Sequence, residues 1–129
     1  MVKRGIQYKG MFLTVFNKIK KQAMRRGIEF SITMEEIGDL FETQNGKCAL
    51  SGVNLTLKKN TTDTTQTASL DRKDSKKGYV IDNLQWIHKD LNKLKSDFTQ
   101  SEFIEMCLKV ALYMQTLEQA KRFLEYINN

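Results

Sequence analysis

Asp71 and Asn92 are the residues of this 129-residue chain whose types and spacing best suit the binding of a divalent cation. The pattern across residues 69–97 indicates a strand, a turn, a second strand and a helix, which brings Asp71 on the first strand close to Asn92 on the helix. One carboxylate and one amide oxygen form a hard, sparse ligand set. This set suits Mg²⁺, because the ion keeps several waters and takes further ligands from phosphate. We therefore predict a Mg²⁺ or Mn²⁺ site held by Asp71 and Asn92.

The surroundings of this predicted metal site are strongly basic. An acidic residue within a basic patch repels a polyanion unless a cation is bound to it. The combination indicates a phosphate backbone as the partner, with double-stranded DNA as the expected form. The basic residues of this segment are Arg72, Lys73, Lys76, Lys77, Lys89, Lys93 and Lys95.

Positive charge is also concentrated near the start of the chain. The net charge is +6, yet residues 1–27 carry eight Lys or Arg and no acidic residue, whereas residues 28–57 carry five acidic residues and one lysine. Clustered positive charge binds a polyanion of any sequence, because it displaces counterions condensed on the phosphates. A merely solvated helix face is the alternative, and a membrane role is not expected because no aromatic stripe accompanies the charge. The residues expected to bind phosphates outside the metal site are Lys18, Lys21, Arg25 and Arg26.

The hairpin and helix resemble the HNH, or ββα-metal (His-Me finger), endonuclease family, and in particular its phage-type members. Those members carry an Asp-Arg-x-Asp-x-x-x-Gly-Tyr hairpin, and residues 71–79 have this pattern, Asp-Arg-Lys-Asp-Ser-Lys-Lys-Gly-Tyr. The closing Asn92-x-x-Lys95-Ser96-Asp97 is also similar to the HNH domain of RNA-guided CRISPR nucleases. The resemblance covers residues 44–108, about half of the chain.

This resemblance implies a role for each residue at a family position. Asp71 and Asn92 stand where the family has its metal ligands. Asn83 stands where an asparagine pins the hairpin through side-chain hydrogen bonds to the backbone, and Lys95 where a lysine often follows the last ligand. The implied activity is hydrolysis of a DNA phosphodiester bond, one strand per active site.

The general base is the main departure from the family pattern, because the histidine that follows the aspartate is replaced by Arg72. Neutral histidine takes a proton from water near neutral pH, whereas a guanidinium stays protonated. His88, the only histidine, lies four residues before Asn92, so we expect both on one helix face and His88 as a relocated base, with a structural helix-start histidine as the alternative. Asp74 is a second candidate base, with turn capping as its alternative, and a metal-bound or bulk hydroxide is the third source of the attacking group. Arg72 or Lys95 would offset charge that builds on the phosphate.

A structural zinc site is not expected. Many family members have a C-x-x-C pair before the hairpin and a second pair of ligands on the helix. Here Cys48 and His88 keep one ligand of each pair, and the other two positions hold Ser51 and Leu91. Two ligands do not close a tetrahedral site, so we predict an apolar contact with Cys48 as a buried small residue.

The first half of the chain has clear helix signals. Apolar residues at helical spacing across residues 12–23 predict a helix that Gly27 ends. Residues 28–32 alternate between apolar and polar and predict a short strand. Thr33 and Glu36 form a capping box, which predicts the start of a second, short helix.

The second half begins with a Thr-rich segment, residues 54–67, which we expect to be mostly an exposed loop. A strand is predicted at residues 68–72, a turn at 74–78, a returning strand at 79–81 and a helix at 85–95. A capping box at residues 99–102 opens the last helix. Its apolar stripe is expected to face the core, with a dimer seam as the alternative, and consists of Phe103, Cys107, Val110, Met114, Leu117 and Leu124.

The predicted fold class is α+β and mostly helical, with a central ββα-metal hairpin and helix flanked by an N-terminal helix and a long C-terminal helix. We expect one domain, residues 1–129, made of a basic helical part (1–46), the ββα-metal core (47–97) and the C-terminal helix (98–129). Two cysteines without a C-x-x-C pair, and no apolar window of membrane-spanning length, indicate a cytoplasmic protein. The resemblance to phage-type members implies that the cell is a bacterial or phage-infected one.

The function predicted from the sequence is metal-dependent DNA cleavage, most simply nicking. A catalytically impaired DNA-binding module is one alternative, because the usual base is missing. A protein-interaction domain that assembles through its C-terminal helix, for example as a homodimer, is another.

Overall fold

The computed structural model describes residues 9–57 and 65–129 of the chain. The described part is α+β and mostly helical, with a single two-stranded antiparallel sheet, so the predicted fold class is confirmed at this level. Contacts between residues divide the chain into two compact units, Met1–Asp97 and Phe98–Asn129. Within the described residues, no helix combines the length and the apolar character needed to cross a membrane.

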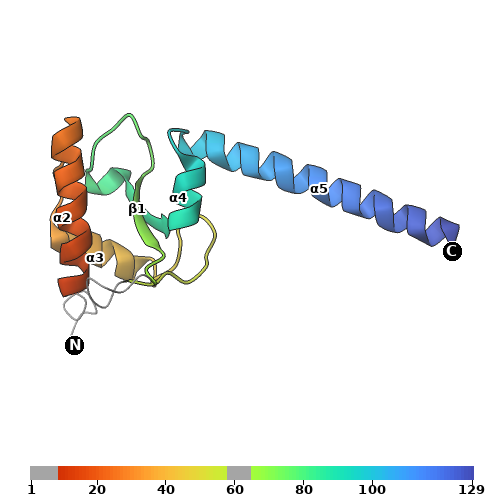
Figure 1. Cartoon of the computed structure of the whole chain (residues 1–129), viewed down its shortest axis with the longest axis horizontal. Coiled ribbons are helices and arrows are strands. Elements are labelled where there is room, and N and C mark those ends of the chain that lie inside the picture. Colours follow the sequence, from red (N-terminus) through yellow and green to blue (C-terminus); the bar gives the residue numbers. More distant parts are fainter. Residues whose placement is uncertain (1–8, 58–64) are drawn as a thin grey trace. The chain divides into compact units, whose positions relative to one another are not determined.

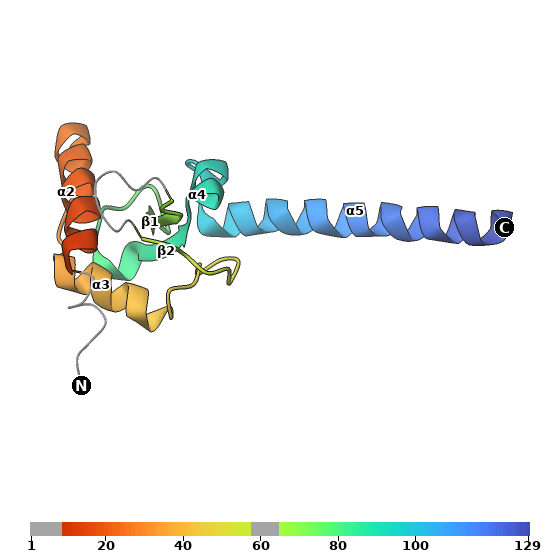
Figure 2. The ribbon, with the colours of Figure 1, turned by 60° about the horizontal axis from the view of Figure 1, so that its bottom comes forward.

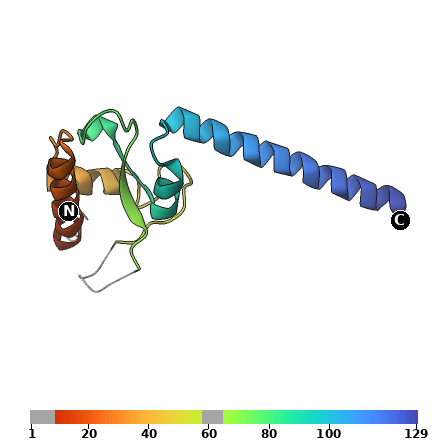
Figure 3. The ribbon, with the colours of Figure 1, turned by 45° about the horizontal axis from the view of Figure 1, so that its top comes forward.

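The first unit is built from helices on either side of the small sheet. Figures 1 and 2 show β1 and β2 between α2 and α4, and Figure 3 shows β1 passing between the same two helices from a third direction. The elements described in this unit are α2 (Lys9–Arg26), α3 (Met34–Thr43), β1 (Ala68–Arg72), a 3-10 turn η1 (Ile81–Asn83), β2 (Leu84–His88) and α4 (Lys89–Lys95).

The N-terminal helix α2 ends where the sequence predicts. Gly27 follows it with a φ of +67°, a left-handed conformation that glycine adopts without strain. The backbone N–H of Ile28 then donates to the carbonyl of Ala23 at 2.8 Å. Phe12 and Ala23 are buried on one face of the helix, and its lysines and arginines from Lys18 onward are exposed. The predicted amphipathic helix is therefore confirmed.

The second helix, α3, begins with the predicted capping box. Thr33 Oγ1 accepts a hydrogen bond from the backbone N–H of Glu36 at 3.1 Å, and the Glu36 carboxylate accepts one from the N–H of Thr33 at 2.9 Å. The strand predicted just before it is wrong, because residues 28–32 contribute only an isolated bridge between Phe30 and Tyr79. Only six residues, 27–32, lie between the end of α2 and the cap of α3, which leaves too little chain for a longer ladder.

The sheet uses a different second strand from the one predicted. β1 spans the predicted residues, but it pairs with β2, in a register that sets Leu70 opposite Trp86 and Asp71 opposite Gln85. The predicted strand at 79–81 and the predicted helix at 85–88 are therefore wrong, and the helix starts only at Lys89. Four consecutive β2 residues are buried, and a strand buried on both faces shows no alternation in its sequence.

Trp86 on β2 lies at the centre of the hydrophobic core. It is fully buried, and its ring contacts the rings of Phe12 on α2 and Phe41 on α3 at centroid distances of 5.9 and 5.6 Å. Its indole Nε1–H donates to the carbonyl of Ile37 at 2.8 Å. One side chain therefore joins both N-terminal helices to the sheet.

The second unit consists of α5 (Gln100–Asn128), which Thr99 caps by accepting a hydrogen bond from the N–H of Glu102. Beyond Phe103 the predicted apolar stripe is exposed, with exposed fractions of 64% for Val110, 56% for Met114 and 38% for Leu117. Within the second unit these side chains are uncovered, and the expectation that the stripe faces the core stays a prediction. An exposed apolar helix of this length is typical of an interaction surface, so assembly through α5, for example as a homodimer, stays a prediction.

Candidate active site

The buried ion pair between Asp71 and Lys95 is the central feature of the predicted metal site. The side chains of Asp71 and Lys95 are only 6% and 1% exposed, and Lys95 Nζ lies 3.1 Å from Asp71 Oδ1. Lys95 Nζ also donates to the carbonyl of Arg72 at 2.9 Å, and Gln85 Nε2 donates to Asp71 Oδ2 at 3.0 Å. The carboxylate of β1 is thus neutralised and oriented by the last turn of α4 and by the neighbouring strand.

Asn92 lies on α4, as Lys95 does, and its side chain faces β1, the strand that carries Asp71. Its Nδ2 donates to Ser69 Oγ at 2.6 Å, so its Oδ1 is turned away from Ser69. None of the described residues donates a hydrogen bond to that oxygen. Asp71 and Asn92 line one cavity of about 220 Å³, which we call the central hollow, and Arg26, Arg72 and Asp97 line it as well.

The central hollow contains oxygens of the kind that a hard divalent cation takes as ligands, although the Lys95 ammonium already pairs with Asp71. Each carboxylate oxygen of Asp71 accepts one hydrogen bond from Lys95 or Gln85 and keeps a second lone pair, and Asn92 Oδ1 supplies a neutral oxygen. In the part of the chain that is described, no three His, Cys, Asp or Glu side chains gather to form an all-protein metal site. Water and phosphate would therefore complete the shell, as is usual for Mg²⁺.

Arg72 is held by the turn that follows β1. Its Nη1 donates to the carbonyls of Ser75 and Lys77 at 2.8 and 2.9 Å, and its guanidinium lies 5.2 Å from the ring centroid of Tyr79. These contacts fix a permanent positive charge on the wall of the central hollow. A guanidinium held in this way can stabilise an anion, but it cannot accept a proton.

Asn83 makes the side-chain hydrogen bonds to the backbone that the resemblance implies. Its Nδ2 donates to the carbonyls of Asp74 and Gly78, and its Oδ1 accepts from the N–H of Asp74, all at 2.9 to 3.0 Å. Asp74 in turn accepts from the N–H of Lys76 at 2.9 Å through its Oδ1. Asp74 therefore caps the turn, the alternative weighed for it above, and the structure does not place it among the residues that line the central hollow.

Replacing Asn83 by alanine is expected to lower the free energy of unfolding by about 2–3 kcal/mol, since three part-buried backbone groups lose their partner. Urea unfolding followed by circular dichroism measures this loss. Asp82→Ala is the matched control, because Asp82 is the exposed neighbour in the same 3-10 turn. Equal losses for the two variants would contradict the assignment of Asn83 as the hairpin pin.

His88 lies outside the central hollow, so its predicted position is wrong. It is the N-cap of α4 with extended backbone angles, and Asn92 therefore does not share a helix face with it. Its Nδ1 accepts a hydrogen bond from the N–H of Asp90 at 3.1 Å. The error follows directly from the wrong start of the helix. The helix-start alternative for His88 matches this geometry.

Cys48 is the cysteine for which the sequence predicts a buried apolar contact. It is buried, and its Sγ accepts hydrogen bonds from the backbone N–H groups of Ser51 and His88, both at 3.4 Å. Burial raises the pKa of the Cys48 thiol, but hydrogen bonds from the Ser51 side chain and from the backbone at His88, Ser51 and Leu50 outweigh burial, and the pKa lies below its ordinary value. Leu91 packs against the core nearby.

The predicted phosphate-binding residues fall into groups that line different hollows. Lys18 and Lys89 line a cavity of about 380 Å³ between α2, β1 and α4, which we call the helix-side hollow. Arg26 lines the central hollow and also a third, outer hollow that contains Lys76 and Lys77. The structure does not bring the remaining predicted residues into these three hollows, namely Lys21, Arg25, Lys73 and Lys93.

The three hollows form a continuous series. The helix-side and central hollows share Leu70, Tyr79 and Asn92, and the central and outer hollows share Arg26, Arg72 and Ser75.

No protein-family model, curated protein or solved structure matches this chain. Any functional conclusion therefore depends on the chemistry of these side chains.

Four residues at the site were not among the candidates chosen from the sequence. Ser69 and Gln85 hold Asn92 and Asp71, and Asp97 and Tyr79 line the central hollow. Alternation along β1 could have indicated Ser69 as a neighbour of Asp71 on the strand. Gln85 had no such signal, because its pairing with Asp71 depends on a strand register that a helix prediction at 85–95 excludes.

Proposed function

We propose that this protein is a metal-dependent endonuclease that hydrolyses one phosphodiester bond of DNA at the central hollow. The observation that carries the proposal is that Asp71 and Asn92, from β1 and α4, line one cavity whose wall also contains two arginines, Arg26 and Arg72. A cation-binding pair of oxygens next to fixed positive charges is the arrangement that phosphodiester hydrolysis requires.

In this proposal Asp71 and Asn92 would hold Mg²⁺ or Mn²⁺. The chemistry that such an ion supplies is polarisation of the phosphate and stabilisation of the leaving oxygen. Lys95 and Gln85 keep the Asp71 carboxylate in one orientation, and Ser69 does the same for the Asn92 amide. Arg72 and Arg26 orient the phosphate and offset the negative charge that builds on it.

We assign Asp97 as the general base that accepts a proton from the attacking water. It lines the central hollow together with Asp71, and among the described residues it forms no ion pair. Asp74 is bound to the turn and His88 lies elsewhere, so neither is retained for this role. A carboxylate on the wall of the hollow can orient water and accept its proton.

The test is nicking of supercoiled plasmid in Mg²⁺, in Mn²⁺ and in EDTA. Wild-type protein is expected to nick with either metal and not in EDTA. Asp71→Asn and Asn92→Ala are expected to lower the nicking rate at least about 100-fold, since removing one charge-stabilising group typically costs about 10²–10³ in rate. Asp71→Asn keeps the shape of the side chain, so Lys95 retains an acceptor.

Asp39→Ala is the matched control, because Asp39 is an exposed carboxylate on α3, away from the three hollows. It is expected to nick at the wild-type rate. Thermal unfolding of each variant shows that it is folded at the assay temperature. Undiminished nicking by both Asp71→Asn and Asn92→Ala would remove this pair from the mechanism.

A non-catalytic DNA-binding module is the second candidate, and the Asp71–Lys95 pair favours it. An ammonium 3.1 Å from the carboxylate already neutralises the charge that would attract a divalent cation. This candidate predicts binding of DNA that weakens steeply with salt and no nicking in any metal. The plasmid assay and a binding titration on the same preparation distinguish the two functions.

A further inference from the structure

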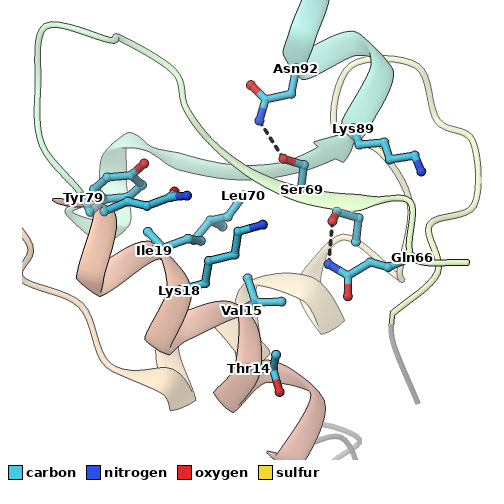
Figure 4. Close-up of a pocket in the computed structure, with 12 residues that line it drawn as sticks. Thr14, Val15, Lys18, Ile19, Gln66, Ser69, Leu70, Tyr79, Lys89 and Asn92 are labelled. Carbon is cyan, nitrogen blue, oxygen red and sulfur yellow. Dashed lines mark hydrogen bonds between the residues drawn. The ribbon is translucent and has the colours of Figure 1, made fainter. Parts of the chain in front are cut away.

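The helix-side hollow combines two kinds of surface that are rarely found together in a purely electrostatic phosphate site. Its floor is apolar and is formed by Val15 and Ile19 of α2 and Leu70 of β1. Figure 4 shows these three side chains between the helix and the strand, with Lys18 extending from α2 toward β1. A cavity of about 380 Å³ lies in the size range of small-ligand sites, in which a few polar groups surround an apolar surface.

Among the described residues, the polar groups that line the helix-side hollow are cationic or neutral, and none is acidic. Lys18 and Lys89 are exposed cations from two different helices. Ser69 and Asn92, which are hydrogen-bonded to each other at 2.6 Å, form part of its wall (Figure 4). The hollow is therefore complementary to a ligand that has one anionic group and one flat, weakly polar body.

We propose that the helix-side hollow binds one unpaired nucleotide of a single strand, next to the phosphate at the central hollow. The base lies on Val15, Ile19 and Leu70, and its phosphate lies between Lys18 and Lys89. This inference rests on the proposed function for the position of the reacting phosphate. The two hollows share Asn92, Leu70 and Tyr79, so a strand can continue from one to the other.

An unpaired nucleotide fits this hollow better than a duplex does. In a duplex the base is stacked and paired, so only the phosphates reach the lysines and the apolar floor stays uncovered. In a single strand each base has a free face, and burial of that face on an apolar surface contributes to binding whatever the base is. The substrate class that follows is DNA with a single-stranded segment, such as a flap or a loop.

The test measures binding in EDTA, so that cleavage plays no part. Short fluorescent single strands of DNA are titrated with wild-type protein, and fluorescence anisotropy gives the affinity. We expect the single strand to bind at least about fivefold more tightly than the duplex of the same sequence. In a series of strands with one abasic nucleotide, one position is expected to lower the affinity at least about fivefold, because the strand loses the base that would cover the apolar floor.

The lysines are tested with two variants of equal charge. Lys18→Gln with Lys89→Gln removes both cations of the helix-side hollow, and Lys47→Gln with Lys109→Gln removes two exposed lysines outside the three hollows. We expect the first variant to lose at least about tenfold more affinity for the single strand. The slope of log affinity against log salt should also fall by about 0.7 for each phosphate that the variant no longer neutralises.

Two results would overturn the inference, namely a flat abasic series or equal losses of affinity for the two lysine variants. A strand of RNA in the same titration shows whether the sugar affects binding, and tighter binding of RNA would overturn the assignment to DNA. Failure here is distinguishable from failure of the proposed function. If the protein nicks plasmid but the abasic series is flat, only the proposed nucleotide site is refuted. If one abasic position lowers the affinity but the protein does not nick plasmid, only the proposed nuclease activity is refuted.

Discussion

Lys95→Met is expected to lower the free energy of unfolding by about 3–5 kcal/mol, because it leaves the buried carboxylate of Asp71 without its counter-ion. The two side chains are almost completely buried, and their atoms lie 3.1 Å apart. Methionine has nearly the length of the lysine stem, so the packing of α4 on β1 changes little. The loss therefore reports the ammonium group, with its ion pair to Asp71 and its hydrogen bond to the carbonyl of Arg72. Urea unfolding at neutral pH measures it.

The double variant separates the charge from the packing. Asp71→Asn in the Lys95→Met background removes the orphaned charge, so the double variant is expected to be more stable than Lys95→Met alone. Lys93→Met is the matched control on the exposed face of the same helix, and it should change stability by less than about 0.5 kcal/mol. Strictly additive losses in the double variant would show that the ion pair contributes no coupling energy.

Trp86→Ala is expected to lower the free energy of unfolding by at least about 3–5 kcal/mol, the usual loss when a buried Trp or Phe is truncated to alanine. A domain of this size has about 5–15 kcal/mol in total, so much of the population would be unfolded. Trp86 is fully buried against Phe12 and Phe41, which connect α2 and α3 to the sheet. Circular dichroism during thermal unfolding follows the loss, since the variant has no tryptophan fluorescence.

Trp86→Phe isolates the hydrogen bond of the indole from the packing of its ring. It removes the donor to the carbonyl of Ile37, and a loss of about 1–3 kcal/mol is expected. Phe123→Ala is the control for removal of an aromatic ring, because Phe123 is 63% exposed on α5 and its loss should be small. If Trp86→Ala unfolds at the wild-type temperature, the central role of this residue in the core is wrong.

Removal of the Trp86 ring also has a functional consequence. Phe12 holds α2 against Trp86, and α2 supplies Val15, Lys18 and Ile19 to the helix-side hollow. A loosened core therefore weakens binding of a single strand as well as stability. Trp86→Ala belongs with the stability variants, and the lysine and abasic experiments carry the test of binding.

Several elements could be predicted because their signals are local. The end of α2 at Gly27 and the start of α3 at Thr33 depend on one positive φ angle and one capping box, both encoded within a few residues. β1 has a mixed apolar and polar pattern that is bounded by turn residues, and its predicted bounds match the structure. In contrast, β2 is buried on both faces, so its sequence has no strand period and resembles the helix that follows it.

The candidate site shows the same division. The order strand, strand and helix was enough to bring Asp71 and Asn92 to one cavity, even though the second strand was placed too early. The misplaced strand mattered for His88, because a residue at a helix cap and one inside the helix point in different directions. His88, four residues before Asn92, would lie on the same face of α4 as Asn92 only if the helix began before His88.

The sequence by itself determined the basic character of the chain, the short-range caps and turns, and the pair of oxygens that suits a cation. Only the tertiary structure decided that Lys95 and Gln85 donate hydrogen bonds to the Asp71 carboxylate, and that Asp97 lines the same cavity. It also decided that α2 and β1 together line the helix-side hollow. Local signals depend on the geometry of a few consecutive residues. The partners of a buried charge depend on which distant segments pack together, and the hydrophobic periodicity of the sequence does not predict that packing.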